Sequence, residues 1–452
     1  MKKFEKKMLF AAVIASVAFV FGLASCQNEE VSLAELAYNS KSEQATVYTV
    51  SFDANGGSLT KKRQNVEENV ATALTSVSTL GATYSDHTFL YWNTESDGSG
   101  DSYADGETIS LTKNLTLYAQ WFLSSKVYSF HSSVTNLPSG TDGQMGTSAS
   151  YCYFGDWPQT IKADSVTVDE STTVTMGGFT YYLGSDGNYY AKCTENAYGS
   201  SYTYSDGTTC AQSSASSEKY FKVEPIKWCV LTNDYDGKKL LLAENILTAN
   251  VPYYGSTSSR SLNGTTIYAN NYKYSNIRAF LNGTANQFVT DGGTATSYDI
   301  DWSDKGFLQS AFTSSAQSLI ATTTVDNSAA STNPASNASQ WNSGTNTYAC
   351  EDTSDKIFLL SEKEATTASY GFASYSSYGI GNTRIRVTTD YAKANYAYQS
   401  TSSGYGGFWW LRSPSYNYSG HARYVVYDGD ANYSHYVNPT YRGVVPALSI
   451  SE

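Results

Sequence analysis

Hydrophobic and polar residues alternate over many short segments of this chain, a period of two that is typical of β-strands with one buried face. Residues 47–52 and 115–121 alternate in this way. Residues 53–57 include Asn and two Gly, which tolerate the positive φ of a hairpin turn. Between 66 and 80 the apolar residues instead recur at a spacing that predicts one helix. Together these patterns predict a small domain at 47–122.

The same stretch carries distinctive short motifs, namely FDANGG at 52–57, YW at 91–92, two Asp-Gly pairs, and LYAQW at 117–121. In these motifs it resembles the Listeria–Bacteroides surface repeat, which is related to the B-repeat of internalins. That family usually has Gly before the central Trp, where this chain has Tyr91. The resemblance implies a small β-grasp module that serves as a spacer on bacterial surfaces.

A longer domain is predicted at 151–452 from further short strands that polar loops separate. Residues 123–150 are polar and contain many Gly and Ser, so this stretch is either a linker or an outer strand. The apolar spacing predicts one helix at 275–282 and a second within 307–320. Strands are predicted at 151–160, 179–182, 189–192, 220–231, 239–247 and 356–361.

The longer domain contains an ordered set of motifs, FGDWPQ, PIKWCVL, SNIRAFLN, FLLSEKEA, WWLRSP and GVVPAL, between residues 154 and 448. In these it resembles a bacterial domain of unassigned function in which the same motifs recur in the same order. The resemblance implies a C-type-lectin-like fold of the formylglycine-generating-enzyme type. The predicted fold class is therefore mostly β, or α+β, with a β-grasp-like repeat followed by this domain.

The C-terminal segment combines an apolar frame at 408–414 and 443–450 with a polar, aromatic window at 416–441. The window holds seven Tyr, two His and three Asn, and no Lys, Glu or Gln. Tyr offers a large contact area with few rotatable bonds, and Asn and Ser adapt their hydrogen bonds. We therefore predict a surface that binds a protein or a glycan. Its candidate residues are Tyr416, Asn417, Tyr418, Ser419, His421, Tyr424, Tyr427, Asp430, Asn432, Tyr433, Ser434, His435, Tyr436, Asn438 and Tyr441, and Arg442 is expected at its rim.

The window also resembles the variable region of proteins that diversity-generating retroelements diversify, in particular the spirochaete type. In those systems template AAY codons become NNY codons, which cannot encode Lys, Glu, Gln, Trp or Met. All five residue types are absent from 416–441, and plain residues such as Ala422, Val425 and Gly429 separate the diverse ones. The alternative is a Tyr-rich surface loop in a Tyr-rich protein.

The N-terminus has the pattern of a secretory signal, with four Lys ahead of an apolar run at 8–24. The run ends in LASC, which resembles the bacterial lipobox, so residues 1–26 are predicted to be a lipoprotein signal peptide with Cys26 as the lipidated residue. The alternative is an ordinary signal peptide with an incidental Cys. Residues 27–46 are polar and are predicted to be a tether. The predicted location is the bacterial outer membrane or cell surface, with the lipid as membrane anchor.

The formal net charge of −12 argues against nucleic acid as a partner, because phosphate binding needs clustered Lys and Arg. The cysteine and histidine spacing fits no metal site, so neither a metal nor a cofactor is predicted. Cys193 and Cys210 flank one loop and are the pair considered for a disulfide. The odd number of cysteines after Cys26 leaves the pairing open among Cys152, Cys193, Cys210, Cys229 and Cys350.

Formylglycine-generating enzymes use cysteines late in the chain for copper-dependent chemistry, whereas the last cysteine here is Cys350. We therefore expect a non-enzymatic, surface-displayed protein that binds its ligand through the window 416–441. One alternative is an enzyme of the formylglycine-generating-enzyme lineage that acts on cell-envelope substrates. Another is a purely structural envelope protein.

Overall fold

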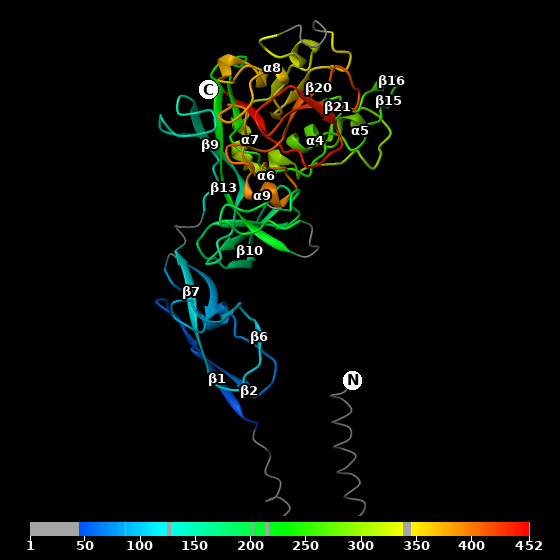
Figure 1. Ribbon diagram of the computed structural model, residues 1–452. Helices are drawn as coiled ribbons and strands as arrows, with labels where there is room; N and C mark the ends of the chain where they lie inside the picture. The colour runs from blue at the N-terminus through cyan, green and yellow to red at the C-terminus, as the bar shows by residue number, and fades with distance from the viewer. Residues whose placement is uncertain are drawn as a thin grey trace, which may run out of the picture. The chain divides into compact units, whose positions relative to one another are not determined.

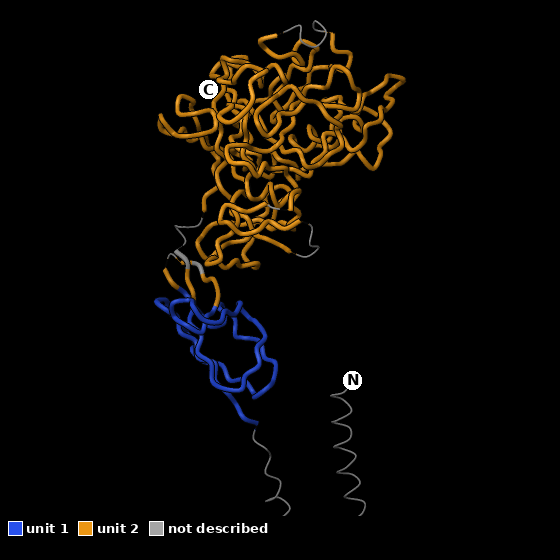
Figure 2. Tube along the Cα trace, viewed as in Figure 1, with its two compact units in different colours: residues 1–83, 92–119 blue, residues 84–91, 120–452 orange. Residues whose placement is uncertain are grey.

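The computed structural model describes residues 45–85, 87–123, 128–200, 202–212, 217–337 and 345–451. The predicted signal peptide, the lipidation site Cys26 and nearly all of the predicted tether lie outside these residues. The chain divides into two compact units, one of residues 1–83 and 92–119 and one of residues 84–91 and 120–452 (Figure 2). Among the described residues, none lies in a helix long and apolar enough to span a membrane.

The N-terminal module is built on a five-stranded sheet with the strand order β2-β1-β7-β4-β5 (Figure 1). The pairing of β1 with β7 is parallel and that of β1 with β2 antiparallel. Val50, Trp92 and Leu117 are fully buried in its core. The alternation at both ends of the module therefore predicts its strands correctly. The strands are β1 (Val47–Asp53), β2 (Arg63–Glu67), β4 (His87–Asn93), β5 (Ser102–Tyr103) and β7 (Leu115–Leu123).

The helix predicted between 66 and 80 is wrong for most of its length. Val66 belongs to β2, where it is buried and lies opposite Tyr48 of β1. The next residues form β3 (Thr72–Ala73), which pairs with β6 (Thr108–Ile109), and only the single turn α3 (Val77–Leu80) is helical. Strand pairing overrides the helical spacing here, because Thr and Ser in this stretch have weak helix propensity.

The C-terminal unit contains a nine-stranded sheet in which every recorded pairing is antiparallel. Its long central strand, β13, pairs with β12 and β9 over its first part and with β9 and β14 over its last part. The strands are β8 (Thr135–Asn136), β9 (Ser150–Ile161), β10 (Val168–Met176), β11 (Phe179–Gly184), β12 (Tyr189–Thr194), β13 (Glu218–Thr232), β14 (Lys239–Ala243), β19 (Ile357–Phe358) and β23 (Ala447–Ile450). β8 lies within 123–150, the stretch for which the sequence leaves linker or outer strand open.

Short helices pack beside this sheet. The helix predicted at 275–282 is α4 (Asn276–Asn282), and the Ser275 side chain caps its N-terminus. The helix predicted within 307–320 divides into α6 (Phe307–Ala311) and α7 (Ser314–Leu319), because Thr313 has an extended backbone and caps the second helix. Further short elements are α5 (Gln287–Thr290), α8 (Glu362–Ala365), α9 (Asp390–Ala394), η2 (Ala329–Thr332), η3 (Ala368–Tyr370), and the two-stranded sheets β15 (Arg260–Leu262)–β16 (Thr265–Ile267) and β17 (Thr323–Val325)–β18 (Thr353–Asp355). The protein is thus mostly β.

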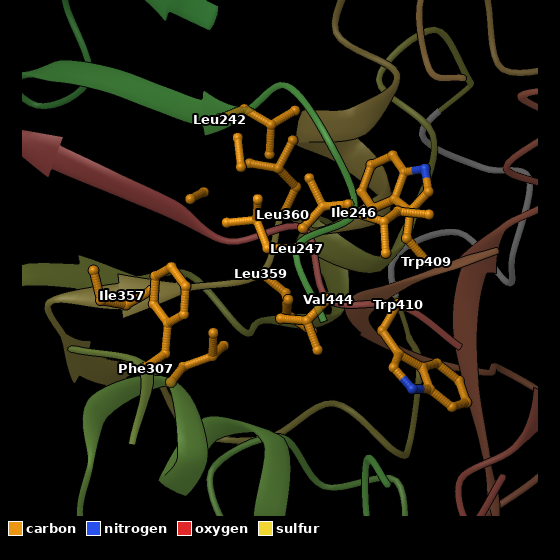
Figure 3. Close-up of a cluster of buried hydrophobic side chains, with 14 of the residues drawn as sticks. Leu242, Ile246, Leu247, Phe307, Ile357, Leu359, Leu360, Trp409, Trp410 and Val444 are labelled. Carbon is orange, nitrogen blue, oxygen red and sulfur yellow. The ribbon is translucent and has the colours of Figure 1, made fainter. Parts of the chain in front are cut away.

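The main core lies where the C-terminal frame meets the large sheet. Trp409 and Trp410 are both fully buried, and their side chains leave opposite sides of the backbone (Figure 3). The indole of Trp409 donates a hydrogen bond to the Arg384 carbonyl at 3.1 Å. The frame therefore has apolar neighbours on both faces and holds the polar window that follows it.

Candidate recognition surface

The window 416–441 is carried by a separate three-stranded antiparallel sheet of β20 (Trp409–Pro414), β21 (His421–Val425) and β22 (Tyr433–Tyr436). β20 is buried throughout, and β21 pairs with β20 on one side and β22 on the other. His421 lies opposite Tyr436, and Tyr424 lies opposite Tyr433. The window is therefore the outer part of a sheet whose innermost strand belongs to the core.

A buried ion pair anchors β20. The guanidinium of Arg412 makes a bidentate contact with the carboxylate of Glu364 in α8, and it also donates to the carbonyls of Leu359 and Asp326. Burial raises the pKa of Glu364, but Arg412 and its other hydrogen-bond donors outweigh burial and bring the pKa below its usual value. This ion pair thus connects the motif WWLRSP to the motif FLLSEKEA.

A second buried ion pair anchors β21. Arg423 Nε lies 3.1 Å from Glu362 Oε2, and the backbone N–H of Glu362 donates to Ser413 Oγ at 2.9 Å. The guanidinium of Arg423 also lies over the Tyr416 ring, 5.6 Å from its centroid. Both inner strands are therefore tied to α8, which fixes the sheet under the window.

The structure separates the candidate residues by exposure. Tyr418, Tyr433 and Tyr436 are 57%, 49% and 51% exposed, which is unusual for large side chains in this protein. Exposed with them are Asn417, Asn432 and Asn438. The half-buried candidates are Tyr416, Ser419, His421, Tyr427, Asp430, Ser434, His435 and Tyr441. Most of the candidate set therefore reaches solvent.

Two placements correct the sequence analysis. Tyr424 is only 7% exposed and belongs to the main core, so its ring is not part of the accessible surface. Arg442, which the sequence placed at the rim of the surface, is 1% exposed. Its guanidinium lies over the rings of Trp410, Tyr424 and Tyr441. Both side chains lie beneath the window.

Four side chains of the window have rings near one another and form what we call the histidine–tyrosine face: Tyr418, His421, His435 and Tyr436. Tyr433, on the same strand as His435 and Tyr436, lies opposite Tyr424. The His421 ring centroid lies 4.7 Å from that of Tyr418 and 4.4 Å from that of Tyr436, and His435 lies 5.4 Å from Tyr436. Burial and the charge of Arg442 lower the pKa of both histidines below its ordinary value. At neutral pH the face therefore offers uncharged imidazoles and phenols, which suit hydrogen bonding and stacking.

A second group of half-buried rings forms what we call the aromatic band, of which the sequence analysis named only Tyr427 and Tyr441 as candidates. The Tyr198 and Tyr441 centroids lie 4.5 Å apart, and Tyr398 stacks on Phe408 at 3.9 Å with nearly parallel rings. The members come from three distant parts of the chain and are Tyr198, Tyr396, Tyr398, Tyr405, Phe408, Tyr427 and Tyr441. In a chain with 39 Tyr, no local pattern marks these rings as neighbours.

Tyr396 of the band has a strained backbone, with φ at 74°. The other described non-glycine residues with positive φ are Asn or Asp, which tolerate this region. Hydrogen bonds from Ala397 N to the Ala392 carbonyl and from Tyr398 N to the Tyr441 carbonyl hold the segment in place. Strain of this kind costs about 1–3 kcal/mol and concentrates at functional sites.

The cysteines of the C-terminal unit are free thiols, so the disulfide considered between Cys193 and Cys210 is not present. Burial raises the pKa of Cys193 to about 12 and that of Cys210 to about 11. Thiols with such values hold their protons at neutral pH and are weak nucleophiles. Among the described residues, no three His, Cys, Asp or Glu side chains gather as metal ligands would.

One polar cluster outside the window was also not predicted. The buried carboxylate of Asp156 accepts hydrogen bonds from Tyr128 Oη at 2.5 Å and from the His131 backbone at 2.7 Å, and His131 Nδ1 lies 2.8 Å away. Burial raises the pKa of Asp156 despite these bonds. The cluster ties residues 128–131 to β9.

Two family models match separate stretches of the chain. Residues 48–120 match the Listeria–Bacteroides repeat domain, and residues 236–452 match a domain of unknown function (DUF6273). The first match confirms the resemblance to the surface repeat, and the second confirms a family of unassigned function for residues 236–452. The motifs FGDWPQ and PIKWCVL lie ahead of that match. The lipid anchor, the lectin-like fold and the likeness to retroelement-diversified proteins stay predictions. No solved structure matches the chain.

Two curated proteins of Evansella cellulosilytica are similar over short stretches. One, named "Putative Gly-rich membrane protein", is 44% identical over 62 residues, which make up 14% of this chain and 7% of that protein. The other, named "Putative membrane protein", is 56% identical over 36 residues, 8% of this chain and 5% of that protein. The chain therefore spans less than a tenth of either relative.

Proposed function

We propose that this protein is a non-enzymatic binding protein, displayed on a bacterial surface through lipid on Cys26. Its ligand is a protein or glycan that contacts the histidine–tyrosine face and the neighbouring aromatic band. The observation that carries the proposal is the exposure of Tyr418, Tyr433 and Tyr436 on a sheet anchored by two buried ion pairs. Exposed aromatic side chains on a rigid scaffold are typical of recognition surfaces.

The surface location is supported by three independent features. The chain carries a Listeria–Bacteroides repeat, and two relatives over short stretches are named membrane proteins. The N-terminal sequence has the pattern of a lipoprotein signal. Mass spectrometry of the membrane-extracted protein tests the anchor: a mature N-terminus at Cys26 with attached acyl chains supports it, and an unmodified chain contradicts it.

Burial within the window supports variable recognition. The plain positions that separate the candidate residues are all buried: Ala422, Val425, Val426, Gly429, Ala431 and Val437. All candidate residues except Tyr424 reach solvent, so they can change without a change in the core. We extend the proposal to diversification by a retroelement. A near-copy of the codons for 416–441 beside a reverse-transcriptase gene would support this extension, and a genome without such a repeat would refute it.

A binding role also agrees with the state of the cysteines. Burial raises the pKa of four thiols in the C-terminal unit, those of Cys152, Cys193, Cys210 and Cys229. Two of them, Cys152 and Cys229, lie on adjacent strands inside the main core. These thiols fit a packing role better than a catalytic one.

The proposal predicts that Tyr418→Ser, Tyr433→Ser and Tyr436→Ser, combined in one full-length chain, abolish ligand binding. The variant is compared with the unaltered chain on printed arrays of purified glycans and extracellular proteins. Its loss of signal should exceed about tenfold, because exposed aromatic anchors dominate such interfaces. Its thermal midpoint should stay nearly unchanged, because none of the three rings is buried.

Leu319→Ser serves as the matched control. Leu319 is 44% exposed on α7, outside the window, so the change removes apolar surface without touching the proposed face. The control should bind as the unaltered chain does. Equal binding by the triple variant and the control would contradict the proposed function.

A further inference from the structure

Arg442 differs from the other buried or partly buried arginines of the C-terminal unit. In each of the others, at least one guanidinium nitrogen has a carboxylate or carbonyl oxygen as partner; these are Arg260, Arg278, Arg384, Arg386, Arg412 and Arg423. Arg442 is 1% exposed, hydrogen-bonds the side chain of Tyr424, and has no hydrogen-bond partner at its Nε and Nη1 atoms. Among the described residues, no carboxylate lies within ion-pair distance of it.

Aromatic rings hold the guanidinium of Arg442 instead. Its Cζ atom lies 4.2 Å from the ring centroid of Tyr424 and 4.8 Å from those of Trp410 and Tyr441. Ring faces attract a cation, but less strongly than the water or carboxylate that they replace. A positive charge is therefore held in a fixed position with N–H donors unused, which is the arrangement that an anionic ligand needs.

The surroundings of Arg442 do not supply that anion. His421 and His435 lie close enough for the Arg442 charge to lower their pKa, in addition to the effect of burial. The Nδ1 atoms of both rings are also buried without a hydrogen-bond partner. Arg442, beneath the histidine–tyrosine face, and His421 and His435, within it, thus each have polar atoms without a hydrogen-bond partner. None of the three carries a negative charge.

Tyr441 connects this charge to the aromatic band. It is half-buried, packs on Tyr198 of the band, and covers one side of the Arg442 guanidinium. The flat faces of the band suit the C–H surface of a sugar ring, because stacking buries apolar area at little entropic cost. An anion that binds this guanidinium must displace the Tyr441 ring, because Arg442 is 1% exposed.

We propose, building on the function proposed above, that the ligand is an acidic glycan whose sugar carries a carboxylate. The sugar ring stacks on the aromatic band near Tyr441, and Arg442 binds the carboxylate through its unused N–H groups. A planar guanidinium matches a carboxylate in a bidentate fashion, which gives specificity as well as affinity. Polyuronates are the simplest polymers with this chemistry.

The test uses the full chain and three immobilised polymers: polygalacturonate, its methyl ester and dextran sulfate. Biolayer interferometry should show binding to polygalacturonate that weakens about tenfold or more on the methyl ester, because a charge-assisted hydrogen bond is lost. Arg442→Met should weaken binding to polygalacturonate equally. Its thermal midpoint should be unchanged or higher, because an unpaired buried charge is replaced by an apolar chain of similar length.

Arg423→Met is the matched control, since Arg423 is equally buried but paired with Glu362. It should lower the thermal midpoint, because Glu362 loses its partner. The inference is overturned if Arg442→Met destabilises the chain but binds normally, if the ester binds as well as the acid, or if only dextran sulfate binds. Absence of binding to all three polymers also overturns it, while the array experiment decides separately whether the tyrosine face binds another ligand.

Discussion

At the scale of single residues, exposure decides what each tyrosine does. Tyr424 and Tyr433 are cross-strand neighbours in the window, yet one lies in the core and the other in solvent. Tyr418, in the turn before β21, is more exposed than either. The three have the same chemistry and lie within a short stretch of sequence. Substitutions at these positions should therefore separate stability from binding.

Tyr424→Ala should destabilise the protein by about 3 kcal/mol, because it removes a buried ring from the main core. Tyr418→Ala should change the free energy of unfolding by less than about 0.5 kcal/mol, since the ring is exposed. Urea denaturation followed by fluorescence measures both. Similar losses at the two positions would show that Tyr418 packs in the core.

At the scale of elements, the sequence motifs of the C-terminal unit supply the side chains that connect one element to another. Arg412 of β20 pairs with Glu364 of α8. Asn282, at the end of α4, accepts a hydrogen bond from Lys356 N and donates to the Ile357 carbonyl, which braces β19. These motifs thus fix the elements that surround the window.

Glu364→Gln should destabilise the protein by about 3 kcal/mol at pH 7, because the buried charge of Arg412 loses its partner. The folded-state pKa of Glu364 is below its ordinary value, so its contribution is complete above the unfolded pKa of about 4.3. That contribution is lost as the pH falls through the folded-state pKa. The difference between the two chains should therefore shrink in urea titrations below about pH 4.

Glu351→Gln is the control for this pair. Glu351 is mostly exposed and pairs with Lys273 at 2.6 Å, so its loss should cost less than about 1 kcal/mol at any pH. A pH-independent difference for Glu364→Gln, or an equal effect of the two changes, would contradict the role of the buried pair.

At the scale of the whole molecule, strand periodicity and local motifs predicted several of the longer elements, including β1, β7, β13 and the capped α4. The helix expected between 66 and 80 fails because pairing with β1 outweighs the local spacing. The aromatic band escapes prediction for a different reason. Tyr198 meets Tyr441 across more than two hundred residues, and only the folded chain brings their rings together.

The burial of Arg442 also could not be predicted from the sequence. Sequence spacing gives no sign that Arg442 lies beneath the window, because the neighbouring Tyr441 and Gly443 carry no burial pattern. Its position follows from the parallel bridge between Trp409 and Gly443, which places the end of the window against β20. Tertiary contacts therefore determine which residues of the window reach solvent and which are buried.

Footprinting tests the central claim most directly. Full-length protein is exposed to hydroxyl radicals with and without a ligand identified on the arrays, and oxidation is measured at each side chain by mass spectrometry. The ligand should protect Tyr418, Tyr433 and Tyr436 from oxidation, while Leu319 on α7 stays equally reactive. Unchanged oxidation of all three tyrosines in a saturated complex would contradict this claim, because the ligand would then lie elsewhere on the chain.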